Sequence, residues 1–151
     1  MTLTPKETQL IRDMQSQEKL CIQKYDRYAG CACSPELKCL LQSIADTERS
    51  HLQALDALSG GTVQQVPPSL SANNANCAKV TCSDENCKQS DTFMCQDLLA
   101  TEKHVSAAYN TAVFEFTDPA ARKLLNHIQS EEQQHGEQLY AYMKANQMAG
   151  Y

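Results

Sequence analysis

The chain has 151 residues and a mass of 16.8 kDa, enough for one domain with a hydrophobic core and too little for two ordinary domains. Its composition, 42% hydrophobic and 21% charged, is globular, and the net charge of −5 argues against a nucleic-acid-binding protein. No apolar run approaches the roughly 18 residues of a membrane span, and the residues after Met1 lack the pattern of a secretory signal. We therefore expect a single domain over residues 1–151 that is made without a signal peptide and binds neither nucleic acid nor membrane.

Capping residues followed by proline mark three of the four expected helix starts. These are Thr4-Pro5, with Glu7 placed for a capping box, Ser34-Pro35 and Asp118-Pro119. A weaker cap, Ser90-Asp91, marks the remaining start, and Gly60-Gly61 is a stop signal. The predicted helices cover residues 5–29, 35–58, 91–116 and 119–146.

Residues 59–90, between the second and third helices, differ in composition because they contain Gly, Pro, Asn and Cys and few large apolar side chains. A helix of about 25 residues is about 38 Å long, and some thirty extended residues easily cover that distance. In an antiparallel four-helix bundle, one connection must run the whole length of the bundle. The sequence thus predicts an all-α, antiparallel four-helix bundle with a long crossover between helices two and three.

Each predicted helix has an apolar stripe at three- and four-residue steps, and a glutamate interrupts every stripe near its middle. The four are Glu18, Glu48, Glu102 and Glu132, and a histidine follows two of them three residues later, at His51 and His135. A shift of 84 residues (18 to 102, 48 to 132) aligns twelve identical residues, including all of these. The pattern predicts two copies of one helical hairpin related by approximate twofold symmetry.

Four carboxylates inside a bundle repel one another and lose their hydration, so they need compensation. Two divalent cations supply four positive charges, and two neutral imidazoles complete the donor set. One Glu from each of two helices plus Glu-x-x-His from each of the other two is the arrangement of ferritin-like di-metal proteins. We therefore predict a dinuclear site formed by Glu18, Glu48, His51, Glu102, Glu132 and His135. Iron or manganese suits these donors best and zinc is possible; the alternative is a hydrogen-bonded polar layer without metal.

Side chains near the predicted ligands have less certain roles. Tyr25 and Tyr109 follow Glu18 and Glu102 by seven residues on the same face, so they either hydrogen-bond a ligand carboxylate or fill the core. Cys21 also points inward and is interpreted as a small buried group rather than a ligand. Two further acidic residues flank the second motif, and helical phase predicts that both are solvated: Glu131 and Glu137.

Seven of the eight cysteines fall into two groups, one at the first helix–helix turn and one in the crossover and the start of the third helix. If the crossover returns along the bundle, both groups meet at one end, where disulfides can form within or between chains. Free thiols or an unrecognised metal site are the alternatives, although the spacing is not that of a structural zinc site. The candidates are Cys31, Cys33, Cys39, Cys77, Cys82, Cys87 and Cys95.

The chain resembles the coat F family of bacterial spore coat proteins, in the ferritin-like superfamily. The similarity rests on segments such as residues 18–25 (EKLCIQKY) and 40–48 (LLQSIADTE), and it extends over the chain except the crossover. The resemblance implies that Glu48 and Glu132 bridge two metals and that the other four predicted ligands are terminal. It also implies synthesis in the mother cell, location in the spore coat, and partners that are further copies of the chain and other coat proteins. A coat assembled in a cell and later exposed to oxidising surroundings accounts for disulfides in a protein without a signal.

Three functions follow from these observations. The first is a structural coat protein that keeps a di-metal centre and self-associates through cysteines. The second is a di-iron or di-manganese enzyme acting on peroxide or dioxygen, so whether the chain is an enzyme stays open. The third, metal storage in a ferritin-like cage, is less favoured because the long crossover and the lack of a fifth helix differ from ferritins.

Overall fold

The computed structural model describes residues 1–67 and 84–148, and within these ranges it contains four α-helices and no strand. The helices are α1 (Pro5–Cys31), α2 (Pro35–Ser59), α3 (Glu85–Val113) and α4 (Pro119–Ala145). The predicted all-α class and the four helices are therefore confirmed. Among the described residues, no helix is both long and apolar enough to cross a membrane.

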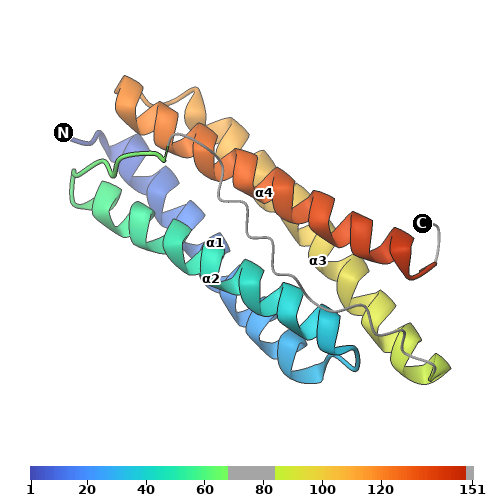
Figure 1. Cartoon of the computed structure of the whole chain (residues 1–151). Coiled ribbons are helices and arrows are strands. Elements are labelled where there is room, and N and C mark those ends of the chain that lie inside the picture. Colours follow the sequence, from blue (N-terminus) through green and yellow to red (C-terminus); the bar gives the residue numbers. More distant parts are fainter. Residues whose placement is uncertain (68–83, 149–151) are drawn as a thin grey trace.

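The helices form a four-helix bundle made of two hairpins (Figure 1). In this bundle α1 packs mainly on α2 and α3 mainly on α4, while α1 also lies beside α3 and α2 beside α4. Helix α2 ends and α3 begins at opposite ends of the bundle, so these two helices run in the same direction. The chain between them must return along the bundle, as the predicted crossover requires. Residues 68–83 of that connection lie outside the described residues.

The predicted helix starts at Pro5, Pro35 and Pro119 are correct because the preceding residue caps each helix. Thr4 and Glu7 form the capping box: Glu7 N–H donates to Thr4 Oγ1 at 3.2 Å, and Thr4 N–H donates to Glu7 Oε2 at 2.8 Å. Ser34 and Asp118 likewise accept backbone N–H groups of the first turns of α2 and α4.

The predicted start of the third helix, at residue 91, is wrong, because α3 begins six residues earlier with Asp84 as its N-cap. Asp91, which we expected in the cap, lies inside α3 and is buried. Its carboxylate accepts the backbone N–H groups of Cys33 at 3.0 Å and Ser34 at 3.1 Å. Asp91 therefore holds the α1–α2 turn against α3 instead of capping its own helix.

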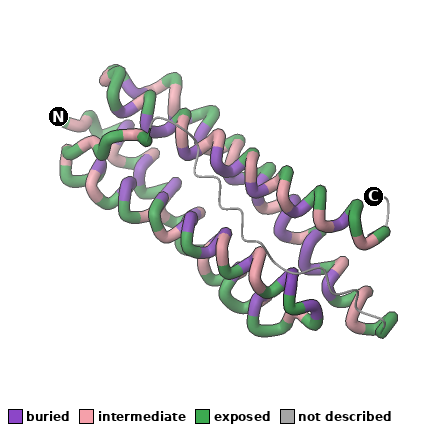
Figure 2. The backbone as a smooth tube through the Cα atoms, in the orientation of Figure 1, coloured by how far each residue is buried: buried purple, intermediate pink, exposed green. Residues whose placement is uncertain are grey.

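Buried residues lie along the inner faces of all four helices (Figure 2). Apolar groups fill the two halves of the interior on either side of the middle, and each buried Leu or Ile contributes roughly 1.5–3 kcal/mol to stability. Large examples that are almost completely buried are Ile11, Met14, Leu37, Leu41, Leu55, Leu98, Phe116 and Leu125. The middle of the bundle is polar.

A disulfide joins Cys33, in the α1–α2 turn, to Cys87, in the first turns of α3, with the two Cα atoms 5.6 Å apart. The two cysteine groups therefore meet at one end of the bundle, as expected. Cys39 is also disulfide-bonded, and two further candidates, Cys77 and Cys82, lie outside the described residues.

Two candidate cysteines are free thiols in the structure, namely Cys31 and Cys95. Cys95 is completely buried on the inner face of α3, and Cys31 is exposed at the last residue of α1. Helical phase explains the difference for Cys95, since it falls on the apolar stripe of α3 rather than in the connection.

Candidate metal centre

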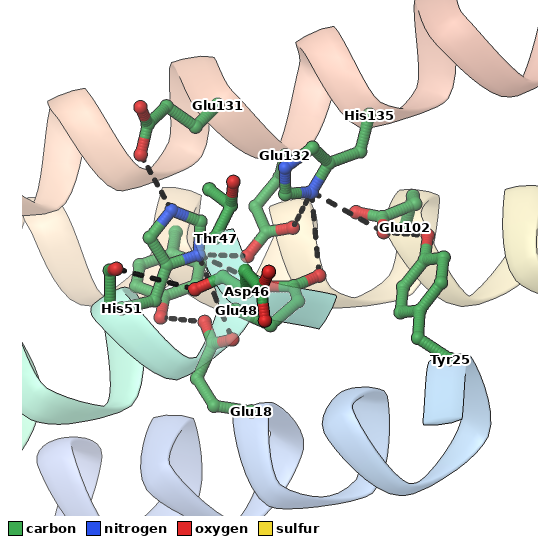
Figure 3. Close-up of polar contacts among 12 residues, drawn as sticks. Glu18, Tyr25, Asp46, Thr47, Glu48, His51, Glu102, Glu131, Glu132 and His135 are labelled. Carbon is green, nitrogen blue, oxygen red and sulfur yellow. Dashed lines mark hydrogen bonds and ion pairs between the residues drawn. The ribbon is translucent and has the colours of Figure 1, made fainter. Parts of the chain in front are cut away.

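The six predicted ligands come together in the middle of the bundle, and each helix contributes one glutamate (Figure 3). Glu18 comes from α1 and Glu102 from α3, while α2 and α4 each supply a glutamate and the histidine one turn later. The exposed fraction of these residues is between 0% and 4%. Helical stripes that bury apolar groups above and below this level thus also bury the carboxylates.

The ligand atoms fall into two clusters that share two carboxylates. The first cluster is Glu18, Glu48, His51 and Glu132, and the second cluster is Glu48, Glu102, Glu132 and His135. Within each cluster, one donor atom of every residue lies within 4.8 Å of the others. This spacing is that of donors around a single ion.

The shared carboxylates divide their oxygens between the clusters. Glu48 places Oε2 3.0 Å from His51 Nδ1 and Oε1 3.4 Å from His135 Nδ1. Glu132 places Oε1 3.2 Å from His51 Nδ1 and Oε2 3.3 Å from His135 Nδ1. The two imidazole rings are stacked with their centroids 5.8 Å apart. Each shared carboxylate can therefore offer one oxygen to each of two neighbouring ions.

The other two glutamates each belong to one cluster. Glu18 Oε2 lies 3.8 Å from His51 Nδ1, and Glu102 Oε1 lies 3.6 Å from His135 Nδ1. Tyrosine hydroxyls donate to both carboxylates crosswise between α1 and α3: Tyr109 donates to Glu18 Oε1, and Tyr25 donates to Glu102 Oε1. Of the two roles considered for these tyrosines, the structure shows the hydrogen bond to a predicted ligand.

The prediction that Glu131 is solvated is wrong. Glu131 is only 5% exposed, and its Oε2 lies 2.7 Å from His51 Nε2, with its Oε1 3.5 Å from His127 Nε2. In Figure 3 the Glu131 side chain reaches from α4 to His51 on α2. The periodicity of a single helix failed here because it does not show which off-stripe positions face a neighbouring helix. Glu137, in contrast, is exposed as predicted.

The bond to Glu131 fixes the orientation of the His51 ring. When Nε2–H donates to Glu131, Nδ1 carries the lone pair and faces the carboxylates of the first cluster. A carboxylate behind a metal-ligating histidine has this effect in metalloproteins. The adjacent acidic pair Glu131-Glu132 at the start of Glu-x-x-His is the one sequence signal that could have indicated this contact.

Burial and mutual repulsion shift the protonation of the whole cluster. Burial, followed by the charge of Glu132, raises the pKa of both Glu18 and Glu102 well above the usual range. Burial also opposes ionisation of Glu48 and Glu132, but contacts with the two imidazoles hold their pKa values below the usual range.

For the two histidines, burial and the neighbouring charges shift the pKa in opposite directions. Burial alone would lower their pKa, but the surrounding carboxylates outweigh it and raise the pKa of His51 and His135 well above the usual value. Without metal, therefore, protons compensate the negative charge of the cluster. These protons occupy the atoms that a metal would need.

Several buried oxygens and one ring nitrogen of the two clusters have no hydrogen-bond partner among the described residues. They are Glu18 Oε2, Glu48 Oε1, Glu102 Oε2, both Oε atoms of Glu132, and His135 Nδ1. An unpartnered buried polar group costs about 1–3 kcal/mol, so such a concentration calls for a further binding partner. Two divalent cations would balance the four carboxylate charges, and the residues fit such a group. Cys21 is buried and belongs to neither cluster, in agreement with its interpretation as a small core residue.

A groove of about 530 Å³ between α3 and α4 reaches the second cluster. Glu102 and Glu132 line its floor, and exposed residues such as Lys103, Glu137 and Tyr140 line it as well. Neither Glu18 nor the two histidines are part of its lining, and Glu132 belongs to both clusters. Glu102 is therefore the residue that assigns the groove to the second cluster.

Comparison with known proteins gives one match. Residues 90–149, which cover most of α3 and all of α4, match the family described as the Coat F domain. Neither the curated proteins nor the solved structures contain a match to the chain.

Proposed function

Since residues 90–149 match the Coat F domain, we propose that the chain is a spore coat protein whose bundle binds two divalent metal ions. Glu48 and Glu132 would contribute to both positions, with Glu18 and His51 at one and Glu102 and His135 at the other. Iron or manganese fits this set of carboxylates and imidazoles best, with zinc as a further possible occupant. We also propose that the bundle is ferritin-like and consists of two copies of one helical hairpin. The twelve identities at an offset of 84 residues support this.

One observation carries this proposal, namely the way in which Glu48 and Glu132 divide their oxygens. Each carboxylate has one oxygen within 3.2 Å of His51 Nδ1 and the other within 3.4 Å of His135 Nδ1. A polar layer held by hydrogen bonds alone would pair these oxygens with donors, but three of the four have none among the described residues. Two bound cations would satisfy these oxygens.

The chain's own residues set the chemistry of the two positions. Tyr25 and Tyr109 donate to the terminal carboxylates and orient them, while Glu131 orients the His51 ring. The apolar layers on either side separate both clusters from the two ends of the bundle. Bound iron or manganese would supply two-electron chemistry toward dioxygen or peroxide.

The coat role rests on the family and on the cysteines. A disulfide already fixes the α1–α2 turn to α3, and Cys31 presents an exposed thiol two residues from that disulfide. We propose that cysteines join copies of the chain, or the chain and other coat proteins, in the oxidising surroundings of the mature spore. Spore coat extracts should contain high-mass forms on non-reducing gels that collapse to the monomer with a reductant, and recovery of monomer alone would contradict this.

A redox enzyme is the second candidate, and the groove that reaches Glu102 and Glu132 favours it. An enzyme needs an open route to its metal, whereas a purely structural site does not. Turnover of hydrogen peroxide by the metal-loaded chain, lost in Glu48→Ala, would support this function. The absence of turnover with two bound ions would leave the structural role.

The metal proposal is tested by elemental analysis of the chain purified without chelator. We expect about two equivalents of iron, manganese or zinc per chain, because the six ligands form two positions. Glu137→Ala, which removes an exposed carboxylate of α4, is the matched control for Glu132→Ala and should leave the metal content unchanged. Fewer than about 0.2 equivalents of every transition metal, in protein reloaded under anaerobic conditions, would refute a dinuclear site.

A further inference from the structure

The two clusters have the same ligand types but different surroundings on the two hairpins. Among the described residues, those that line the groove beside the second cluster all lie on α3 and α4, for example Leu99, Ser106, Gly136 and Tyr140. The positions 84 residues earlier lie on α1 and α2, next to the first cluster. The side chains at these paired positions differ in size and in their contacts, and so the two faces of the bundle differ.

The α1–α2 face carries larger or bonded side chains at the corresponding positions. Leu52 corresponds to Gly136, and Ile22 corresponds to Ser106. Gln15 and Asp56, which correspond to Leu99 and Tyr140, form a hydrogen bond from Gln15 Nε2 to Asp56 Oδ1 at 2.7 Å. This bond spans α1 and α2, so the face beside the first cluster is bridged.

Gly136 lies in the interior of α4, where glycine is less favourable than alanine by about 1 kcal/mol. Its backbone does not demand glycine, since its φ is not in the left-handed region. A Cβ added there would lie 3.6 Å from Leu99 Cδ1, an ordinary contact. The missing side chain therefore serves neither a turn nor a close approach, and its effect is to leave space in the groove.

The first cluster, in addition, has a carboxylate behind its histidine. Glu131 holds His51 Nε2 at 2.7 Å, and position 47, which corresponds to 131, is a threonine. A negative charge behind a ligating imidazole makes the imidazole a stronger donor and raises metal affinity. The first cluster thus lies beside a bridged face, and Glu131 backs its histidine.

We propose that the two metal positions are unequal: the second cluster, beside Gly136, is the one through which metal enters and leaves and at which a small external ligand binds. The first cluster retains its ion. This inference rests on the proposed dinuclear site and adds to it a division of roles. Dioxygen and hydrogen peroxide are small enough to use the groove, and azide serves as their probe.

The test measures the release of Co²⁺ from the loaded chain to excess chelator. We expect two phases of one equivalent each. Gly136→Leu, which copies Leu52 into the groove, should slow the fast phase by about tenfold and abolish the change that azide causes in the visible spectrum of bound Co²⁺. Gly30→Leu is the matched control, because Gly30 lies in α1 with no heavy atom near its added Cβ, and it should change neither reading.

A second pair of variants examines the slow phase. Glu131→Thr, which copies Thr47, should accelerate the slow phase by about tenfold to a hundredfold and leave the fast phase unchanged. Glu131→Gln keeps an acceptor for His51 Nε2–H and should give an intermediate rate. Gly136→Ala, which adds a single methyl group at ordinary contact distance, replaces the leucine variant if that variant loses helicity.

The outcomes separate this inference from the proposed function. Failure of the chain to bind Co²⁺ would refute the dinuclear site itself. Binding of two equivalents that leave at one common rate, or a fast phase and azide response that persist in a folded Gly136 variant, would refute only the inequality of the two positions.

Discussion

The two clusters have the same ligand types but different surroundings. Each contains one unshared glutamate, one histidine and both shared carboxylates, yet Glu131 backs His51 whereas the groove reaches the other side at Glu102. The difference arises from residues outside the repeated motif, at positions such as 52 and 136. In the proposed function, the six ligands determine where metal binds and the neighbouring residues determine how each position behaves.

The largest expected effect comes from removing a shared carboxylate. Glu48→Ala takes one donor from each cluster, so we expect the bound metal to fall from two equivalents to nearly none. Glu102→Ala removes a donor from the second cluster alone and should leave about one equivalent. Elemental analysis checks both variants, and the retention of two equivalents by Glu48→Ala would contradict bridging.

The next effect concerns the turns of the two hairpins. The α1–α2 turn is tied covalently to α3, whereas the α3–α4 turn is held to α1 by the Thr117 N–H bond to Glu7 Oε1 at 3.3 Å. Replacing Cys33 and Cys87 by serine opens a loop with a sequence separation of 54, which should reduce the free energy of unfolding by about 4 kcal/mol. Glu7→Gln should reduce it by about 1 kcal/mol.

Denaturant unfolding of the metal-free protein measures both changes. Cys31→Ser is the control, because it removes an exposed free thiol and should leave stability unchanged. A disulfide variant no less stable than this control would show that the covalent tie adds nothing to the α1–α2 turn.

The pH dependence of stability should change sign when metal binds. The lowered pKa values of Glu48 and Glu132 affect stability only up to the usual glutamate range, because above it both residues are ionised in the folded and the unfolded state. Above that range, the raised pKa values of Glu18, Glu102, His51 and His135 mean that the metal-free folded state binds more protons than the unfolded chain. Its stability should therefore fall as pH rises above about 4.5 for the glutamates and above about 6.5 for the histidines. The slope is up to about 1.4 kcal/mol per pH unit for each proton released.

Metal must displace these protons, so the stability gained from metal should grow over the same pH range. Thermal melts from pH 5 to 8, with and without metal, compare the two slopes. The account would be contradicted if the metal-free chain became more stable toward pH 8.

The smallest expected effect distinguishes the clusters through their tyrosines. Because the bonds cross between α1 and α3, Tyr25→Phe should weaken metal retention at the second cluster, and Tyr109→Phe at the first. Each loss should be about tenfold. Phase-resolved release measures it, and an effect of Tyr25→Phe on the slow phase alone would contradict the crosswise arrangement.

Much of the arrangement could be predicted from the sequence because periodic patterns determine which face of a helix is buried. Proline after a capping residue located three helix starts, and the stripe positions of Glu18 and Glu102 brought them to the same level of the bundle. Two predictions failed where contacts between helices decided the outcome. Asp91 was expected in a local cap but bonds the distant α1–α2 turn, and Glu131 was expected in solvent but bonds His51.

The central claim, that two cations balance the four buried carboxylates, is tested most directly by anomalous diffraction from crystals of the metal-loaded chain. We predict two peaks about 3.5–4 Å apart. Glu48 and Glu132 should lie between them, with His51 Nδ1 and His135 Nδ1 on opposite sides. Loaded crystals in which these carboxylates bind no metal and hydrogen-bond only to one another and to the imidazoles would contradict the account.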